Sequence, residues 1–267
     1  MEGSYEMDVL EKIVLEKKKE VAVHKVNVPI GDLESRPGFQ RKCYSLRERL
    51  LQAEPYGIVS EFKRKSPSKG IINDQADVVK TTTGYQSAGA SGISILTDTP
   101  FFGGAYEDLI QARKELTVPV LRKDFIVDEY QVLETKAMGA DVMLLIAACL
   151  SQRQIMELAK LARSVGLEIL LEIHSEEEYD EDLLEYIDIL GVNNRNLKTF
   201  ETSIYTSIDL AEKLPDNVVK ISESGLKSLE DLQLINKAGY KGFLIGEQFM
   251  RHADPAAELS AFLSGKV

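Results

Sequence analysis

The feature that most constrains the fold of this chain is an alternation, repeated beyond Pro55, between short aliphatic runs and longer segments with helical patterning. Runs of β-branched and aliphatic residues bounded by Gly or polar turns predict buried strands. Eight such runs cover Gly57–Lys63, Gly92–Thr97, Val118–Lys123, Val142–Ala147, Glu168–Ile173, Ile187–Asn193, Val218–Ser222 and Gly242–Gly246. Helical segments separate them, for example Asp77–Ser87, Tyr106–Glu115, Glu129–Met138, Gln152–Ser164 and Ser228–Lys237.

Eight β/α units in about this length predict an α/β fold of the closed (β/α)8 TIM-barrel type, with an open doubly wound sheet as the alternative. Ahead of the first run, helices are expected from about Asp8 to Lys25 and from Ser45 to Ala53. No low-complexity linker is present. The sequence therefore predicts a single barrel domain over residues 1–267, of which about 1–54 form an N-terminal helical extension.

Charge and cysteine content exclude several classes of partner. The chain has 32 Lys and Arg against 43 Asp and Glu, a net charge of −11, which argues against a nucleic acid or an anionic membrane as the main partner. Its two cysteines, Cys43 and Cys149, lack metal-ligand spacing, so neither a disulfide framework nor a metal site is expected. No apolar run approaches the ~20 residues of a membrane span, and residues 1–6 lack a signal-peptide pattern. A cytoplasmic location is expected, and either a monomer or a dimer fits.

The end of the first run, Ser60-Glu61-Phe62-Lys63, carries a carboxylate and an amine two residues apart. Alternation along a strand places Glu61 and Lys63 on one face, and charges on a half-buried face are costly unless they are paired or used. A solvated strand end with a structural ion pair is a sufficient explanation for this pair alone. The other runs make the pair more informative.

The carboxyl ends of the other runs are also polar, and the chemistry of a (β/α)8 barrel lies at that end. Alternation from the barrel-filling aliphatic positions directs four polar residues inward, namely Lys123, Glu172, Asn193 and Glu223. With Glu61 and Lys63 they form a mixed-charge group that a purely structural role explains poorly. His174 follows Glu172 in the chain, but alternation predicts that it points away from the face of Glu172.

Glycine-bearing turns after the last two runs indicate a phosphate site. Ser224-Gly225 follows the seventh run and Gly246-Glu247 ends the eighth, and glycine there lets backbone N–H groups approach an anion. Ser66, in the turn after the first run, reaches the same side because the first and eighth strands of a closed barrel are neighbours. An anionic small-molecule substrate is therefore expected, collected by the local basic residues of an otherwise acidic protein.

Through these blocks the chain resembles the indole-3-glycerol-phosphate synthase family, (β/α)8 enzymes of tryptophan biosynthesis. The resemblance covers essentially the whole chain and rests on the segments Ser60–Ser68, Leu121–Ile126, Leu171–His174, Gly191–Leu197, Ser222–Gly225 and Phe243–Glu247. It implies a carboxy-lyase without a cofactor that acts on the phosphorylated substrate 1-(2-carboxyphenylamino)-1-deoxyribulose 5-phosphate. The implied reaction closes the indole ring, with loss of carbon dioxide and water, to give indole-3-glycerol phosphate.

The resemblance also implies roles for single residues. Lys123 is expected to be the general acid of ring closure, Glu172 and Lys63 to act as acid and base in an order that stays open, and Glu61 to orient the two lysines. The implied substrate-binding residues are Asn193, Arg195, Glu223, Ser224 and Phe102, the last enclosing the anthranilate ring together with the N-terminal helix. The implied phosphate-binding residues are Ser66, Gly225, Gly246 and Glu247, the last through its backbone N–H.

Two other functions stay open on the residues alone. A Schiff-base aldolase would use Lys123 as the nucleophile on a sugar phosphate, and borohydride would then trap substrate on that residue. A non-catalytic barrel would bind phosphate at the same mouth and serve as a scaffold. Neither alternative needs the whole group of polar strand ends together with an N-terminal extension.

Overall fold

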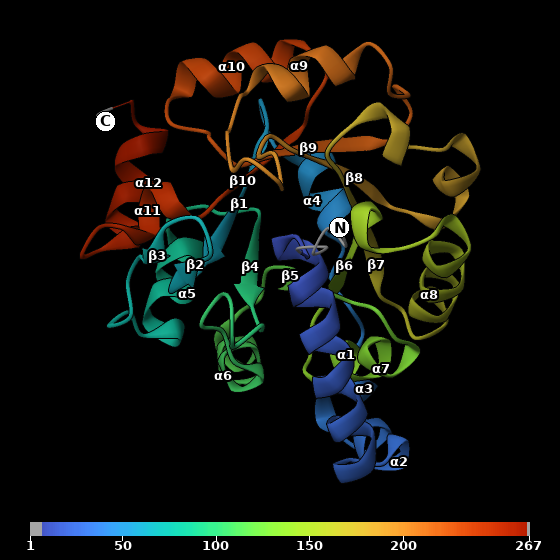
Figure 1. The fold of residues 1–267 in the computed structure, drawn as a ribbon. Coiled ribbons are helices and arrows are strands. Elements are labelled where there is room, and N and C mark those ends of the chain that lie inside the picture. The colour runs from blue at the N-terminus through green and yellow to red at the C-terminus, as the bar shows by residue number, and fades with distance from the viewer. Residues whose placement is uncertain (1–6, 266–267) are drawn as a thin grey trace, which may run out of the picture.

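The computed structural model describes residues 7–265, and in it eight parallel strands close into a barrel (Figure 1). The strands are β1 (Gly57–Phe62), β4 (Gly92–Leu96), β5 (Val120–Lys123), β6 (Val142–Ile146), β7 (Glu168–Ile173), β8 (Ile189–Asn193), β9 (Val219–Glu223) and β10 (Gly242–Ile245). β1 pairs with β4 on one side and with β10 on the other. The predicted (β/α)8 barrel is confirmed, and the open sheet is wrong because the first and last strands are hydrogen-bonded to each other.

Most of the expected helices are present around the barrel. They are α5 (Val78–Ser87), α6 (Tyr106–Glu115), α7 (Glu129–Ala137), α8 (Gln152–Ser164) and α10 (Leu229–Lys237), to which the structure adds α9 (Tyr205–Ala211), α11 (Glu247–Met250) and α12 (Pro255–Leu263). The turn after β1 contains a small hairpin of β2 (Lys65–Ser66) and β3 (Gly70–Ile71), which the sequence pattern did not reveal. A short 3-10 helix, η1 (Ala147–Cys149), follows β6.

The connection between β7 and β8 departs from the regular pattern. It forms two 3-10 helices, η2 (Glu176–Glu178) and η3 (Glu181–Tyr186), in place of an α-helix. The stretch from residue 176 to residue 182 is acidic at every position except Tyr179. Like charges three and four residues apart destabilise an α-helix, which explains why this segment does not continue as one.

The apolar core has an inner and an outer layer. Inward-facing side chains of the strands form one cluster inside the barrel, including Val59, Leu121, Leu170 and Ile221. The outward-facing residues pack against the surrounding helices in a second, larger cluster. The two layers follow from the alternation of side chains along each strand.

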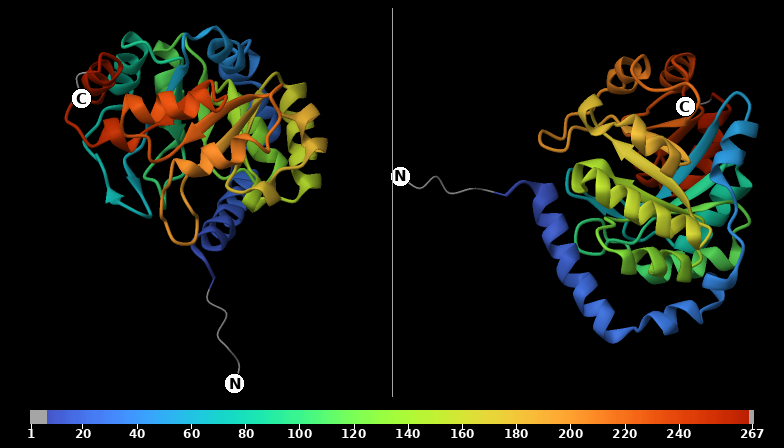
Figure 2. Two further views of the ribbon diagram at one scale, coloured as in Figure 1. Left: turned by 90° about the horizontal axis from the view of Figure 1, so that it is seen from above. Right: turned by 90° about the vertical axis from the view of Figure 1, so that its right-hand side faces the viewer.

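The N-terminal segment contacts both ends of the barrel (Figure 2). It consists of α1 (Val9–Asn27), α2 (Ile30–Glu34), α3 (Pro37–Gln40) and α4 (Leu46–Gln52). α1 begins with an Asp8–Glu11 capping box, and its first turns reach the carboxyl ends of the strands. α4 lies at the opposite end, where Leu46 and Leu50 complete the inner cluster and pack close to the first residues of β1, β4 and β10.

A side chain of the barrel caps α4. The Glu168 carboxylate, at the start of β7, accepts hydrogen bonds from the backbone N–H groups of Leu46 (2.9 Å) and Arg47 (3.1 Å) and from the Ser45 hydroxyl. A negative charge at this helix end satisfies otherwise unpaired N–H donors. The contact fixes α4 beneath the barrel. None of the helices within residues 7–265 combines the length and apolar character needed to cross a membrane.

Candidate active site

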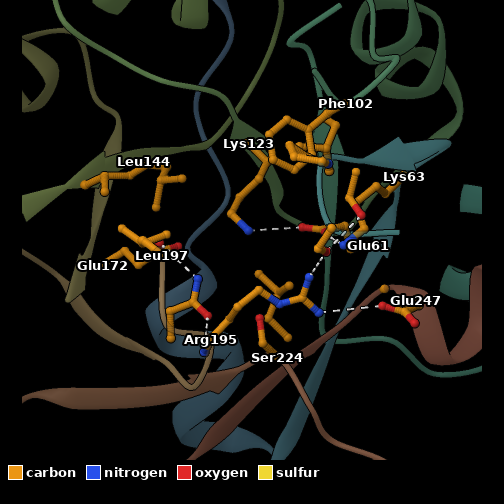
Figure 3. A pocket seen from close by; sticks show the side chains of 18 of the residues that line it. Glu61, Lys63, Phe102, Lys123, Leu144, Glu172, Arg195, Leu197, Ser224 and Glu247 are labelled. Carbon is orange, nitrogen blue, oxygen red and sulfur yellow. Dashed lines mark hydrogen bonds and ion pairs between the residues drawn. The ribbon is translucent and has the colours of Figure 1, made fainter. Parts of the chain in front are cut away.

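A pocket opens at the carboxyl ends of the strands (Figure 3), and the first turns of α1 also line it. The predicted site residues that line it are Glu61, Lys63, Ser66, Phe102, Lys123, Glu172, Asn193, Arg195, Ser224, Gly225, Gly246 and Glu247. Glu223 lies behind this surface, fully buried against Lys123. The structure therefore brings the predicted residues together at one mouth.

Glu61 holds the two lysines of the mouth. Its Oε2 lies 3.3 Å from Lys123 Nζ and accepts a hydrogen bond from Ser94 (2.9 Å), while its Oε1 lies 3.3 Å from Lys63 Nζ. Burial alone would raise the pKa of the Glu61 carboxyl, but the lysines and the Ser94 hydroxyl lower it to about 2. Glu61 is therefore a fixed negative charge. Ser94, one strand away on β4, was not predicted from sequence.

Lys123 is one ammonium among three carboxyl groups. Besides Glu61, Glu223 Oε2 lies 3.6 Å from its Nζ, and Glu172 also acts on it. Burial lowers the pKa of Lys123, but the surrounding carboxyl groups, Glu61 first, outweigh this effect and raise it above its usual value. Lys123 is thus held in the protonated form, as an acid.

The other two carboxyl groups near Lys123, those of Glu172 and Glu223, have pKa values shifted in opposite directions. Burial and the nearby Glu172 charge raise the pKa of Glu223, whereas Lys123 and Asn193 help to lower that of Glu172. Asn193 Nδ2 donates to Glu172 Oε1 (3.1 Å), and a hydrogen bond between the Glu172 and Glu223 carboxyl groups shifts their pKa values in the same two directions. Glu172 is accordingly the ionised member and Glu223 the protonated one. A Cβ atom at Gly191 would come within 2.5 Å of Glu223 Oε1, so this strand glycine provides the space for Glu223.

The prediction that His174 points away from Glu172 is wrong. His174 Nε2 lies 3.4 Å from Glu172 Oε1, and Nδ1 lies 3.3 Å from Glu178 Oε2. Strand β7 ends at Ile173, so His174 already belongs to the following turn and strict alternation no longer applies. Its backbone N–H donates to the same Glu178 oxygen (2.8 Å), which fixes the turn.

One wall of the pocket is apolar. Phe102 and Phe125 lie with ring centroids 5.9 Å apart, and α1 contributes Leu10 and Ile13. The sequence prediction named Phe102 but missed Phe125, although Phe125 lies two residues after Lys123. These apolar side chains line the same pocket as the charged group, and Phe102 lies beside Lys123 (Figure 3), so the site can hold a flat apolar ring beside polar chemistry.

Backbone geometry singles out the turn after β9. Ser224 and Gly225 both have positive φ, 71° and 73°, and such a pair of left-handed residues is unusual when one of them is serine. Successive left-handed or alternating residues direct backbone N–H groups toward a common point, an arrangement that binds anions. Ser66 and Gly246 line the same side of the pocket.

The side chain of Glu247, besides the backbone N–H that the sequence prediction assigns to the phosphate, contacts basic residues. Its carboxylate lies at the mouth, 3.7 Å from Arg195 and 3.7 Å from Lys69. Arg195 also donates to the Ser68 hydroxyl in the hairpin turn after β1. The Glu247 carboxylate is therefore paired with Arg195 and Lys69 beside the region where the phosphate is expected to bind.

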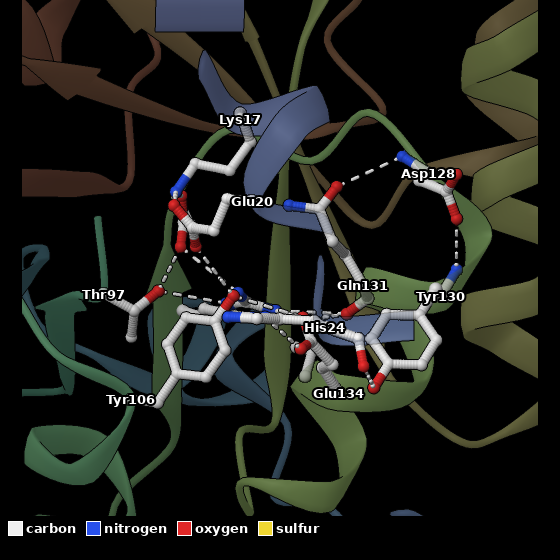
Figure 4. A network of polar contacts seen from close by, with 12 residues as sticks. Lys17, Glu20, His24, Thr97, Tyr106, Asp128, Tyr130, Gln131 and Glu134 are labelled. Carbon is white, nitrogen blue, oxygen red and sulfur yellow. Dashed lines mark hydrogen bonds and ion pairs between the residues drawn. The ribbon is translucent and has the colours of Figure 1, made fainter. Parts of the chain in front are cut away.

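A second group of buried charges lies under α1, on the outer side of β5 (Figure 4). Lys17, 1% exposed, lies 2.9 Å from Asp98 and 3.0 Å from Asp124. Asp124 also pairs with Arg122 (3.2 Å), and Arg122 lies 3.6 Å from Glu134. This α1 cluster, made of Lys17, Asp98, Arg122, Asp124 and Glu134, ties α1 to the loops that carry Phe102 and Phe125. Within residues 7–265 no group of three or more His, Cys, Asp or Glu is arranged to hold a metal ion.

Comparison with known sequences gives one consistent family. A family model described as indole-3-glycerol phosphate synthase matches residues 10–262. The chain is 45% identical over 256 residues to an indole-3-glycerol phosphate synthase from Bacteroides thetaiotaomicron, covering 96% of this chain and 98% of that protein. It is 40% identical over 261 residues to a protein of the same name from Polynucleobacter asymbioticus, covering 95% and 98%.

Comparison with solved structures reveals the same architecture in distant sequences. A 3-hexulose-6-phosphate synthase has a TM-score of 0.63 at 13% identity, covering 79% of this chain and all of that one (100%). A structure described as native KDPGal has a TM-score of 0.56 at 14% identity, covering 78% and 93%. At these identities the likeness shows the barrel fold alone.

Proposed function

This chain belongs to the indole-3-glycerol phosphate synthase family, and we propose that the pocket at the carboxyl ends of its strands is where the reaction takes place. The chain is a carboxy-lyase of tryptophan biosynthesis, and its substrate is a phosphorylated small molecule. The observation that carries the assignment of the site is Lys123, held as an ammonium by three carboxyl groups beside an apolar wall.

Lys123 is the general acid of ring closure in this proposal. It donates its proton to the ribulose carbonyl oxygen as the ring carbon that bears the carboxylate attacks the carbonyl carbon. Carbon dioxide then leaves, and the electrons of the broken C–C bond restore the aromatic ring. Phe102, Phe125 and the first turns of α1 enclose that ring, which keeps water from the reacting atoms.

Glu172 and Lys63 divide the dehydration step. Glu172 is the ionised member of its pair and serves as the base that removes the proton. Lys63 pairs with Glu61 Oε1, whereas Lys123 pairs with Oε2. Lys63 serves as the acid that protonates the departing hydroxyl, which leaves as water. Asn193 holds the hydroxyl groups of the substrate, Glu223 contacts Lys123 from behind the pocket surface, and Glu61 orients the two lysines.

The phosphate binds at the other end of the pocket in this proposal. Backbone N–H groups around Ser224, Gly225, Gly246 and Glu247 approach it, together with the Ser66 hydroxyl. The Glu247 carboxylate now holds Arg195 and Lys69, and an incoming phosphate would compete with it for both cations. Arg195 thereby links the phosphate to the hairpin after β1.

The assay that tests the reaction supplies 1-(2-carboxyphenylamino)-1-deoxyribulose 5-phosphate and follows the fluorescence of the indole product, without added metal or nucleotide. Product formation that disappears in Lys123→Ala supports the proposed site. Unchanged turnover in that variant would contradict it.

The Schiff-base alternative is disfavoured by the electrostatics of Lys123. A lysine nucleophile needs a lowered pKa so that its free amine is present, and the three carboxyl groups raise the pKa of Lys123 instead. Borohydride treatment in the presence of substrate is therefore expected to leave Lys123 unmodified. A reduced adduct on this residue would support the aldolase mechanism.

A further inference from the structure

His174 is held between a proposed catalytic carboxylate and a carboxylate nearer the surface. Its Nε2 lies 3.4 Å from Glu172 Oε1 and its Nδ1 lies 3.3 Å from Glu178 Oε2, while its side chain is only 10% exposed. The backbone N–H of His174 donates to the same Glu178 oxygen, so Glu178 holds both the ring and the backbone of this residue. Nothing in the proposed reaction yet uses this residue.

The groups that face His174 favour its charged form. Glu172 on β7 and Glu178 on η2 raise its pKa, whereas burial and the more distant Lys123 on β5 lower it. Burial raises the pKa of the Cys149 thiol, after β6, to about 12, and the negative charges of the same two glutamates raise it further. Cys149 therefore adds no charge. The two carboxylates outweigh the opposing effects, and the pKa of His174 lies above its usual value.

We propose that His174 is a positioning residue for Glu172: its imidazolium, held in place by Glu178, supplies a lasting positive charge beside Glu172 Oε1. Nε2 makes no hydrogen bond to another described residue, and it is aimed at the carboxylate. Oε1 is then held by His174 and Asn193, so the orientation of the Glu172 carboxylate in the pocket wall is fixed. This inference rests on the proposed role of Glu172 as a base.

The timing of the reaction explains why a second cation is needed. Lys123 is the largest influence that keeps Glu172 ionised. When Lys123 gives its proton to the substrate, it becomes neutral and that influence is lost. His174 takes no part in the proton transfer and stays positive, so Glu172 remains a carboxylate until it removes the proton in the dehydration step.

The first test is the pH dependence of kcat/KM. In His174→Gln the amide can still approach Glu172 but carries no charge, so the pKa of Glu172 rises and the acidic limb of the profile moves to higher pH by about one unit. Glu178→Gln should move it in the same direction by less, because the histidine remains but loses part of its support. His24→Gln is the matched control, since His24 pairs with Glu134 (2.9 Å) away from the pocket, and its profile should not move.

The second test measures the charge of His174 directly. The chain has three histidines, so nitrogen-15 imidazole signals can be assigned by replacing each in turn. The His174 ring should remain protonated above its usual pKa of about 6.5, and Glu172→Gln and Glu178→Gln should each lower its titration point. A His174 that titrates at its ordinary value, or an unshifted acidic limb in His174→Gln, would overturn the inference. A fully active Glu172→Gln variant would instead refute the role of Glu172, while the titration would still report the pairing.

Discussion

Two groups of buried charge share strand β5 and differ in what covers them. In the α1 cluster, Lys17 and Arg122 face three carboxylates, and every member has an opposite charge within 3.6 Å. In the mouth, Lys123 lies 3.3 Å from Glu61 and 3.6 Å from Glu223, and the cation closest to Glu172 is His174, at 3.4 Å. The first group is covered by a helix (Figure 4), whereas the second lies at a pocket.

Strand β5 thus contributes both to the stability of the fold and to the proposed chemistry. Arg122 and Lys123 are adjacent, so alternation sends the guanidinium outward under α1 and the ammonium inward to the pocket. A paired cluster under a helix stabilises that helix only as long as all its members are present. A cluster of charges at a pocket is accessible to a substrate, and such clusters are typical of functional sites. Variants in the two clusters should therefore change different properties.

The largest expected effect is on stability, in the α1 cluster. Lys17→Met leaves Asp98 and Asp124 buried without their ammonium partner, and it should lower the free energy of unfolding by about 3–5 kcal/mol. Urea denaturation measures it. Lys19→Met, at an exposed position on the same helix, is the control and should cost under about 1 kcal/mol. Equal stability of the two variants would show that the cluster does not hold α1.

The second prediction concerns activity at the mouth. Lys123→Ala removes the proposed acid and should lower kcat/KM on the order of 10²-fold or more. It also leaves Glu61 and Glu223 buried without this ammonium, so the free energy of unfolding should fall as well. Steady-state kinetics and urea denaturation of the same preparation measure both. Lys241→Ala, at a partly exposed lysine just before β10, should change neither. A Lys123→Ala protein that loses stability but keeps its activity would reverse the comparison.

The third prediction uses pH to separate two glutamates of the mouth. The pKa of Glu61 is lowered to about 2, so its contribution to stability is complete above its usual pKa of 4.5 and is lost as pH falls from there toward 2. The pKa of Glu223 is raised, so its contribution is present below 4.5 and is lost as pH rises through the raised value.

Glu223→Gln is neutral at every pH, so it should gain stability relative to the native chain between pH 5 and pH 8, by about 1.4 kcal/mol for each unit of pKa shift it removes. Glu61→Gln should lose stability over the same range. Urea denaturation at several pH values measures both. A Glu223→Gln protein with the same pH dependence as the native chain would show that Glu223 is ionised.

The smallest expected effect is at the phosphate end. Ser66→Ala removes one hydroxyl and should raise KM about five-fold, the equivalent of ~1 kcal/mol, with kcat nearly unchanged. Inorganic phosphate should compete with the substrate in the native enzyme, and more weakly in the variant. Gly246→Asp is a poorer probe, because a Cβ atom there would lie 3.0 Å from Glu61 Oε1 and disturb the lysine pair as well. An unchanged KM for Ser66→Ala would remove this hydroxyl from the phosphate site.

The barrel and the mouth could be predicted because both follow from the spacing of aliphatic residues along the strands and from the polar residues at the strand ends. Residues at strand ends such as Lys123 and Glu172 inherit their direction from the aliphatic positions before them, and a closed barrel brings those ends together. Glu61 and Asn193 were located by the same reasoning. Local pattern was sufficient wherever a side chain still belonged to a strand.

The features that sequence missed depend on contacts between distant segments. Lys17 lies in the run Glu16-Lys17-Lys18-Lys19-Glu20, where it resembles a solvated surface lysine until the loops with Asp98 and Asp124 cover it. His174 was assigned the wrong direction because strand β7 stops one residue before it. No local signal distinguishes such residues from their neighbours.

The placement of α4 has a consequence for the order in which the protein can be built during synthesis. Leu46 and Leu50 leave the ribosome before any strand of the barrel exists, and the cap of α4 is Glu168, more than a hundred residues later (122 for the bond to Leu46). Contacts between such distant segments form slowly because a long loop must first close.

The apolar face of α4 and the buried lysine of α1 must therefore wait for their partners while translation continues. Until β7 is made, these segments are exposed to aggregation and to chaperones. The helix α4, which covers the amino-terminal ends of the strands, is synthesised before the barrel. It can pack in its final position only after most of the strands have been made.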